Sequence, residues 1–177
     1  WCTDHRQHHR EVDTDQDPYS INKGVTYAHI GWMLLKPEYE ESPFPKDLTK
    51  DKLVMWQHNN YLLVAIISCF LLPWALGMAM GDPFGGLILA GLGRLVLVHH
   101  STFFVNSLAH IWGSKPYSLK DTARDNPVVA FLTYGEGYHN FHHKFEADYR
   151  NGIRWYHYDP TKWWIKTMAW VGQAKSL

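Results

Sequence analysis

The chain has no excess of charge of either sign and almost no cysteine. Its 17 Lys and Arg residues balance 17 Asp and Glu residues, so the net charge gives no indication of nucleic acid or an acidic partner. Two cysteines, Cys2 and Cys69, are too few to indicate a disulfide framework. The length of 177 residues is that of one domain.

Histidine is the compositional outlier, with 12 residues. Six of them form two stretches with the same His-x-x-His-His spacing, at residues 5–9 and 139–143. Positions i, i+3 and i+4 lie on one face of a helix, so we expect each triplet to aim three imidazoles at one point. Imidazole is a good ligand for divalent transition metals, including iron. One triplet could be a chance cluster, but two with long apolar segments between them indicate a shared metal centre.

Two apolar segments separate the triplets. Residues 61–80 contain no charged side chain, and at about 1.5 Å per residue they span roughly 30 Å, the thickness of a bilayer's hydrocarbon core. A short turn at 81–83 leads into a second candidate span at 84–105, which is less uniform because it contains Arg94. We therefore predict a transmembrane hairpin that returns the chain to the side it left, with both triplets on that side.

The roles of several polar residues can be interpreted in two ways. Asp13, Asp15 and Asp17 follow the first triplet and could orient ligand imidazoles. A solvated turn is an equal alternative for Asp13 and Asp15, and the Asp17–Pro18 pair favours a structural turn. His29 lies among aromatic residues, where a lone histidine is more often a hydrogen-bonded core residue than a ligand.

Four motifs together resemble the membrane fatty acyl desaturases of the stearoyl-CoA type, in that family's order and over nearly the whole chain. They are His5-Arg6-x-His8-His9, Ala28-His29-Ile30-Gly31-Trp32, Asn106-Ser107-x-Ala109-His110 and Gly135-Glu136-Gly137-x-His139-Asn140-x-His142-His143. The resemblance implies an all-α integral membrane protein. It also implies a cytoplasmic helical cap that holds a histidine-rich metal site.

The family carries an earlier His-x-x-x-x-His box that this sequence lacks. By resemblance, residues 1–177 are therefore expected to form a partial desaturase domain without its N-terminal part. Two of the family's four transmembrane helices would be present, at about 61–80 and 84–105. The chain by itself is expected to be inactive, because its metal site would be incomplete.

The resemblance also implies roles for individual residues. Asn106 would bind metal through a water, and Glu136 would accept a ring N–H from a ligand histidine. Trp1, Thr102 and Phe103 would shape the bend of an acyl tunnel, although the family usually has Trp where Phe103 stands. The other substrate contacts, near the thioester and CoA, would be Asp4, Trp32 and Lys36. The implied metal ligands are His5, His8, His9, His110, His139, His142 and His143.

The implied function is oxygen-dependent desaturation of a fatty acyl chain in fatty acid biosynthesis, at Δ9 and on acyl-CoA, by two iron ions with O₂ as co-substrate. Thr3 and Pro37 replace basic residues of the stearoyl-CoA enzymes, so acyl carrier protein or a lipid-bound substrate stays open. Electrons would come from a separate donor such as cytochrome b5, ferredoxin or rubredoxin, and the surroundings would be membrane lipid, with no nucleic acid. The alternatives are a membrane hydroxylase with the same histidine boxes and an inactive metal-binding fragment. A zinc hydrolase is disfavoured, because it needs fewer histidines.

Overall fold

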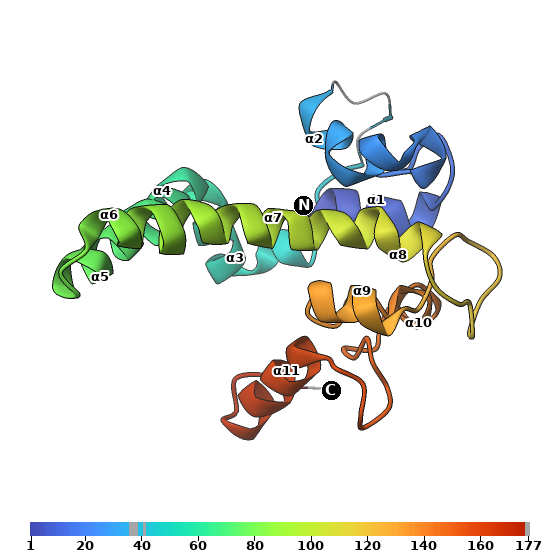
Figure 1. Cartoon of the computed structure of the whole chain (residues 1–177). Helices are drawn as coiled ribbons and strands as arrows, with labels where there is room; N and C mark the ends of the chain where they lie inside the picture. The colour runs from blue at the N-terminus through green and yellow to red at the C-terminus, as the bar shows by residue number, and fades with distance from the viewer. Residues whose placement is uncertain (36–38, 41, 176–177) are drawn as a thin grey trace. The chain divides into compact units, whose positions relative to one another are not determined.

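The protein is helical, as the sequence predicts (Figure 1). The computed structural model describes residues 1–35, 39–40 and 42–175. Within these ranges the only β-type pairings are two isolated bridges, which join Asp125 to Ser114 and to Tyr138. Both cysteines are free.

The chain divides into two compact units. We call the first the hairpin unit, which comprises Trp1–Thr3 and Ser42–His100, and the second the histidine unit, which comprises Asp4–Glu41 and Ser101–Leu177. The hairpin unit contains most of the apolar helical sequence. Its helices are α3 (Lys52–Asn59), α4 (Tyr61–Ile66), α5 (Leu72–Ala79), α6 (Pro83–Gly85) and the first part of α7 (Arg94–Asn106), with a 3-10 turn at Leu48–Lys50 and π-helical stretches at Ile67–Leu71 and Gly86–Gly93.

Two continuous helical segments are long and apolar enough to cross a membrane. They are Tyr61–Ala79, with 19 residues, and Pro83–Ile111, with 29 residues. Most of their residues are not buried within the protein, which is what a lipid-facing surface requires. Between them the chain turns at Gly81, and Asp82 caps the second segment by accepting a hydrogen bond from the Gly85 N–H at 2.8 Å.

The two arms of the hairpin touch through glycine. A Cβ added to Gly86 would lie 2.5 Å from the Pro73 carbonyl oxygen and 2.7 Å from the Gly77 Cα. No side chain fits at that separation. Small residues at helix crossings are typical of membrane helices, because without a hydrophobic driving force between them they associate by close packing.

The histidine unit is built from short helices and capped turns. Asn126 starts α9 by accepting hydrogen bonds from the Val128 and Val129 N–H groups at 2.8 and 3.2 Å. Asp159 starts α11 in the same way, with the Lys162 N–H at 2.9 Å. The helices are α1 (Cys2–Glu11), whose first two residues belong to the hairpin unit, then α2 (Trp32–Leu34), the end of α7, α8 (Leu108–Ile111), α9 (Pro127–Leu132), α10 (His139–Lys144) and α11 (Pro160–Trp170), with a 3-10 turn at Ile21–Lys23 and a π-helical stretch at Tyr27–Gly31.

The glycine contact gives a direct test of the hairpin. Replacing Gly86 with Leu should destabilise the protein by about 1–3 kcal/mol, the usual cost of overpacking, although Leu favours a helix more than Gly does. The measurement is thermal unfolding in detergent. Ala90→Leu is the matched control, because Ala90 is exposed on the same segment. Equal melting temperatures for the two variants would contradict the close contact.

Candidate metal centre

Seven histidines from three helices meet in the histidine unit. They come from α1, α8 and α10, and they are the seven histidines that the sequence resemblance marks as ligands. Each offers one ring nitrogen to one of two groups, and within a group these nitrogens all lie within 4.8 Å of one another. The first group is His8, His110, His139 and His143; the second is His5, His9 and His142.

The expectation that each triplet aims at one point is wrong. In each triplet the i and i+4 residues share a group, while the i+3 residue joins the other group: His8 leaves His5 and His9, and His142 leaves His139 and His143. Helix geometry gives the reason. At 3.6 residues per turn, i and i+4 differ by about 40° around the axis, whereas i+3 and i+4 differ by about 100°. The two helices α1 and α10 therefore supply rings to both groups.

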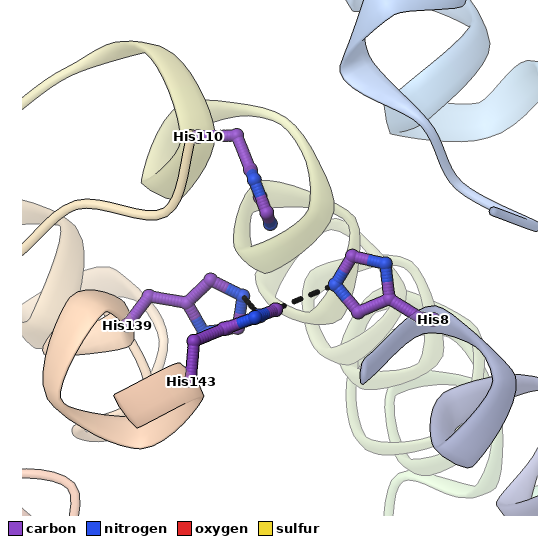
Figure 2. Close-up of side chains that lie close together, drawn as sticks. All are labelled: His8, His110, His139 and His143. Carbon is purple, nitrogen blue, oxygen red and sulfur yellow. Dashed lines mark hydrogen bonds between the residues drawn. The ribbon is translucent and has the colours of Figure 1, made fainter. Parts of the chain in front are cut away.

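The first group is fully buried (Figure 2). His8 Nε2 lies 3.2 Å from His143 Nε2, which lies 3.0 Å from His139 Nε2. Figure 2 shows the His110 ring pointing toward the same space from its own helix. The His110 Nε2 atom has no hydrogen-bond partner among the described residues.

The second group is half-buried. His9 Nε2 lies 3.2 Å from His5 Nε2 and 3.0 Å from His142 Nε2. The His9 and His143 rings stack with their centroids 4.4 Å apart, so the two groups adjoin. On its other side His9 Nδ1 lies 3.7 Å from the Glu146 carboxylate.

Asp17 fixes the orientation of His8. Its Oδ1 accepts a hydrogen bond from His8 Nδ1 at 2.8 Å, and the carboxylate also accepts from the Tyr19 and Asp13 N–H groups at 2.9 and 3.0 Å. Asp17 is 1% exposed. Because a carboxylate only accepts, the His8 proton sits on Nδ1, and Nε2 presents its lone pair to the group.

Thr122 and Asp13 fix His110 in the same manner. His110 Nδ1 lies 2.7 Å from Thr122 Oγ1, which donates to Asp13 Oδ1 at 2.6 Å; Asp13 Oδ2 also accepts the Thr122 N–H at 2.6 Å. The Thr122 hydroxyl donates its single proton to Asp13. Its oxygen can therefore only accept a hydrogen bond from His110 Nδ1–H. His110 Nε2 is therefore unprotonated and faces the other rings.

This donor set fits a metal ion. The buried His110 Nε2 carries a lone pair that no donor among the described residues satisfies, and a cation in the space between the rings would satisfy it. Imidazole nitrogens suit zinc, copper, iron and nickel. The carboxylates of Asp13 and Asp17, one hydrogen bond or two behind the rings, supply negative charge near a bound cation.

The environment also keeps the imidazoles neutral, the form that binds metal. Burial, followed by the charge of neighbouring histidines, lowers the pKa of His5 and His142 to about 4 and that of His9 to about 2. The same causes lower the pKa of His139 and His143. At neutral pH none of these rings needs to lose a proton before it coordinates a cation.

Other residues with predicted roles lie at or beyond the edge of the groups. Asn106 is half-buried at the end of α7, one turn before His110. Glu136 is exposed, and Nδ1 of the nearby His139 has no hydrogen-bond partner among the described residues. His29 lies outside both groups, with Nδ1 3.0 Å from Ser107 Oγ, as expected for a core histidine.

Two of the predicted substrate residues lie together beside the centre. The Trp32 ring is 6.3 Å from that of Phe103 and 4.8 Å from that of Tyr19, which in turn lies 5.2 Å from the His8 ring. Thr102 is exposed and Asp4 half-buried in the same unit. Trp1 belongs to the hairpin unit, where it is 72% exposed. Lys36 lies outside the described residues.

Sequence reasoning missed Thr122 and Asn140 as supports of the site. Asn140 is fully buried, and its side chain makes four hydrogen bonds to the backbone of residues 117–123, at 2.8–3.1 Å. It thereby anchors the loop that carries Thr122 to the helix that carries His139. The only signal was the position of Asn140 inside the second histidine stretch. Asp13 and Asp17 take the orienting role that was left open for them, whereas Asp15 is exposed.

Comparison with known proteins gives one consistent result. The fatty acid desaturase family profile matches residues 1–170. The chain is 47% identical to a probable acyl-CoA desaturase of Schizosaccharomyces pombe, 46% to acyl-CoA desaturase 1 of Saccharomyces cerevisiae and 38% to an sn-1 stearoyl-lipid 9-desaturase of Synechocystis. All of this chain is covered in each comparison, but it spans only 38%, 35% and 54% of those relatives.

The Thr122 contact can be tested through metal retention. Replacing Thr122 with Val keeps the shape and removes the oxygen that holds His110 Nδ1. Metal affinity should fall roughly 10- to 100-fold, as is usual when a partner behind a ligand is removed. The measurement is competition with a chelator, and Thr122→Ser, which keeps the hydroxyl, is the matched control. Equal metal affinity for all three proteins would show that Thr122 does not position the ring.

Proposed function

The chain belongs to the fatty acid desaturase family, and on that basis we propose that the protein carries out oxygen-dependent desaturation of a saturated fatty acyl chain. The observation that carries this proposal is the pair of adjoining histidine groups. Seven imidazoles with no carboxylate among them lie in two adjoining groups, a donor set that would suit two metal ions. A hydrolytic zinc site needs three protein ligands and an open position, so this set exceeds what such chemistry requires.

We propose iron as the metal, in two ions. Bound there, iron would supply the activation of O₂ and the removal of hydrogen from an unactivated carbon, which no amino-acid side chain can perform. Asn106 would contribute through a water, in keeping with its place one turn before His110. Glu136 would contribute through a hydrogen bond to a ligand ring. The proposed protein ligands are His5, His8, His9, His110, His139, His142 and His143.

The residues behind the ligands perform three tasks. Asp17 and the Thr122–Asp13 pair hold the Nδ1 protons of His8 and His110, so that Nε2 faces the metal. Burial keeps the rings neutral and excludes bulk water from the reacting carbon. The two carboxylates offset the positive charge of the ions. Each task acts on orientation, hydration or charge, which are the contributions a protein makes to cofactor chemistry.

The acyl chain would lie along the aromatic side of the first group. Phe103 and Trp32 pack beside Tyr19 and His8, which supports an apolar tunnel at that edge. We propose Thr102 as a further part of its wall, and Asp4 and Lys36 as contacts to the carrier end. Two of the relatives are named for acyl-CoA and one for a stearoyl lipid. We propose acyl-CoA as substrate and Δ9 as the position.

The protein is a membrane protein, as its family and its two long apolar helices indicate. We propose that Tyr61–Ala79 and the part of Pro83–Ile111 up to about residue 105 enter the bilayer as a hairpin, with the histidine centre at the cytoplasmic surface. Electrons would come from a separate protein such as cytochrome b5, ferredoxin or rubredoxin. The reaction removes two electrons from the substrate, and O₂ needs four to form two waters, so two must be supplied.

The experiment that tests the function is expression of the complete gene product in a desaturase-deficient host, with the fatty acids identified by mass spectrometry. The wild type should form a cis alkene near the middle of the chain. His142→Ala should abolish turnover, because the second group would keep only two rings, while membrane insertion stays intact. His29→Ala is the control variant and should retain iron.

Three outcomes would contradict these assignments. Hydroxylated products without alkene would show that the enzyme is a hydroxylase and not a desaturase. Activity of His142→Ala at the wild-type level would remove this ring from the ligand set. Iron loss in His29→Ala comparable to that in His142→Ala would show that the ligand set is drawn too narrowly.

A second prediction concerns the tunnel. Phe103→Trp should change chain-length preference or double-bond position while leaving iron content unchanged, because Phe103 lies near Trp32 but is not one of the grouped histidines. A shift of the reacting carbon by about 1 Å can cost roughly a hundredfold in rate. The measurement is the product distribution over acyl chains of several lengths. An unaltered distribution would exclude Phe103 from the tunnel.

A further inference from the structure

A hollow of about 580 Å³ lies in the histidine unit, lined by residues that have no role in the proposed metal or acyl sites. Its lining is aromatic and polar rather than aliphatic. Three different loops contribute to it, from the segments 114–127, 131–138 and 154–158. The residues that matter here are Tyr138, Arg154, Tyr156 and His157.

The segment 151–158 at one side of this hollow is held firmly at its base. Asp159, which is fully buried, accepts hydrogen bonds from the Asn151 and Gly152 N–H groups, both at 2.9 Å. The buried Lys162 Nζ donates to the Gly152 and Arg154 carbonyls. A loop anchored by buried charged groups presents its tip in a fixed position.

The tip of this loop is exposed and aromatic. Trp155 is 89% exposed and Tyr156 is 58% exposed. Arg154 donates a hydrogen bond from Nη1 to the Tyr156 hydroxyl at 2.9 Å, and its guanidinium lies 5.9 Å from the centre of that ring. Trp, Tyr and Arg are the residues that most often dominate binding at protein interfaces. A rigid surface of these three is typical of a docking site for a protein.

A series of ring contacts leads from this surface to the metal centre. The Trp155 ring lies 5.6 Å from the Tyr156 ring, which lies 5.1 Å from His157. The His157 ring stacks on Tyr138 at 4.3 Å, with the planes 10° apart. Tyr138 is bonded to His139, a member of the first histidine group. Three ring contacts and one covalent link therefore join exposed Trp155 to a residue of the buried centre.

The first histidine group needs such a route because its rings are not accessible at the surface. His8, His110 and His139 are only 2–3% exposed. Desaturation requires that –CH₂–CH₂–, O₂, two electrons and two protons give –CH=CH– and two waters. The electrons must cross the protein, and electron tunnelling weakens with distance and weakens faster across gaps than through packed atoms.

We propose that the surface formed by Arg154, Trp155 and Tyr156, with the adjoining hollow, is the docking site of the one-electron donor protein, and that the rings of His157 and Tyr138 lie on the path of entry. This inference rests on the proposed function for its need of electrons. The partner is a small redox protein with its cofactor near the surface and an acidic rim that meets Arg154. A lipid surface fits less well, since the Asp125 carboxylate lines the hollow.

The test is anaerobic stopped-flow reduction of the iron-loaded complete protein. The reductants are the reduced soluble domain of cytochrome b5, a reduced [2Fe–2S] ferredoxin and reduced rubredoxin, each used separately, with dithionite as the small-molecule reference. Trp155→Ala should slow reduction by the effective protein donor at least about tenfold, as for an interface residue of this kind, and should leave the dithionite rate and the iron content unchanged. Trp164→Ala is the matched control, since Trp164 is 65% exposed in the same unit.

A second pair of variants, at His157, separates binding of the donor protein from electron transfer through the protein. His157→Ala should lower the rate at saturating donor, whereas His157→Phe, which keeps a ring, should restore it. Trp155→Ala should instead raise the donor concentration needed for half the maximal rate. A donor-driven rate that stays at the wild-type value in both Trp155→Ala and His157→Ala would overturn the proposal.

Three other outcomes would also contradict the proposed docking site. A slower dithionite reaction in Trp155→Ala would mean a structural defect. Reduction of the wild type by dithionite but by none of the three proteins would leave the surface without a partner of the proposed class. Weaker binding of Trp155→Ala to phosphatidylcholine vesicles, with donor-driven reduction unchanged, would assign the surface to the membrane. Because these measurements are anaerobic, a failure to form alkene with O₂ and acyl-CoA would count against the proposed function and not against the docking site.

Discussion

Imidazole nitrogens that face one another in a buried space are the constraint on which the histidine unit depends. Burial lowers the pKa of rings such as His139 and His143, and hydrogen bonds from Nδ1 direct the Nε2 atoms of His8 and His110 inward. The His110 Nε2 atom has no hydrogen-bond partner among the described residues, and an unpaired polar atom in a low-dielectric interior is costly. A bound metal ion would coordinate this nitrogen, so metal binding would be coupled to folding of the unit.

The supports of the centre reach across the chain. Asp13 follows the first histidine triplet, yet it holds Thr122, which lies 109 positions later in the sequence. Asn140 stands within the second triplet and holds the loop that contains Thr122. The three helices that carry the grouped histidines are thus joined by polar contacts. Aligning rings from separate elements within a few tenths of an ångström requires such locked side chains.

The two apolar helical segments are held together in a different way from the histidine unit. Their outward side chains face lipid, so burial of apolar surface cannot hold the two arms together. Contact between Gly77 and Gly86 allows the backbones to approach closely, and Asp82 ends the turn with a cap. A short, tightly packed hairpin is the simplest way to insert two spans between two parts of one metal-binding sequence.

Much of this could be predicted from the sequence, and the reason is locality. Helix periodicity is fixed by backbone geometry, so the two His-x-x-His-His stretches had to present rings on one face. The length of the uncharged run at 61–80 had to match a bilayer. His110, by contrast, was marked as a further ligand only by the resemblance to the desaturase family.

The remaining features were decided by tertiary structure. Which rings share a group depends on how α1, α8 and α10 face each other, and small angular differences along a helix moved His8 and His142 to the opposite group from the rest of their triplets. The choice between an orienting role and a solvated turn for Asp13 depended on a threonine from a distant loop. Spacing along a chain fixes the directions of side chains on one element. It does not fix the partners that other elements bring to them, because those contacts form only when the whole unit packs.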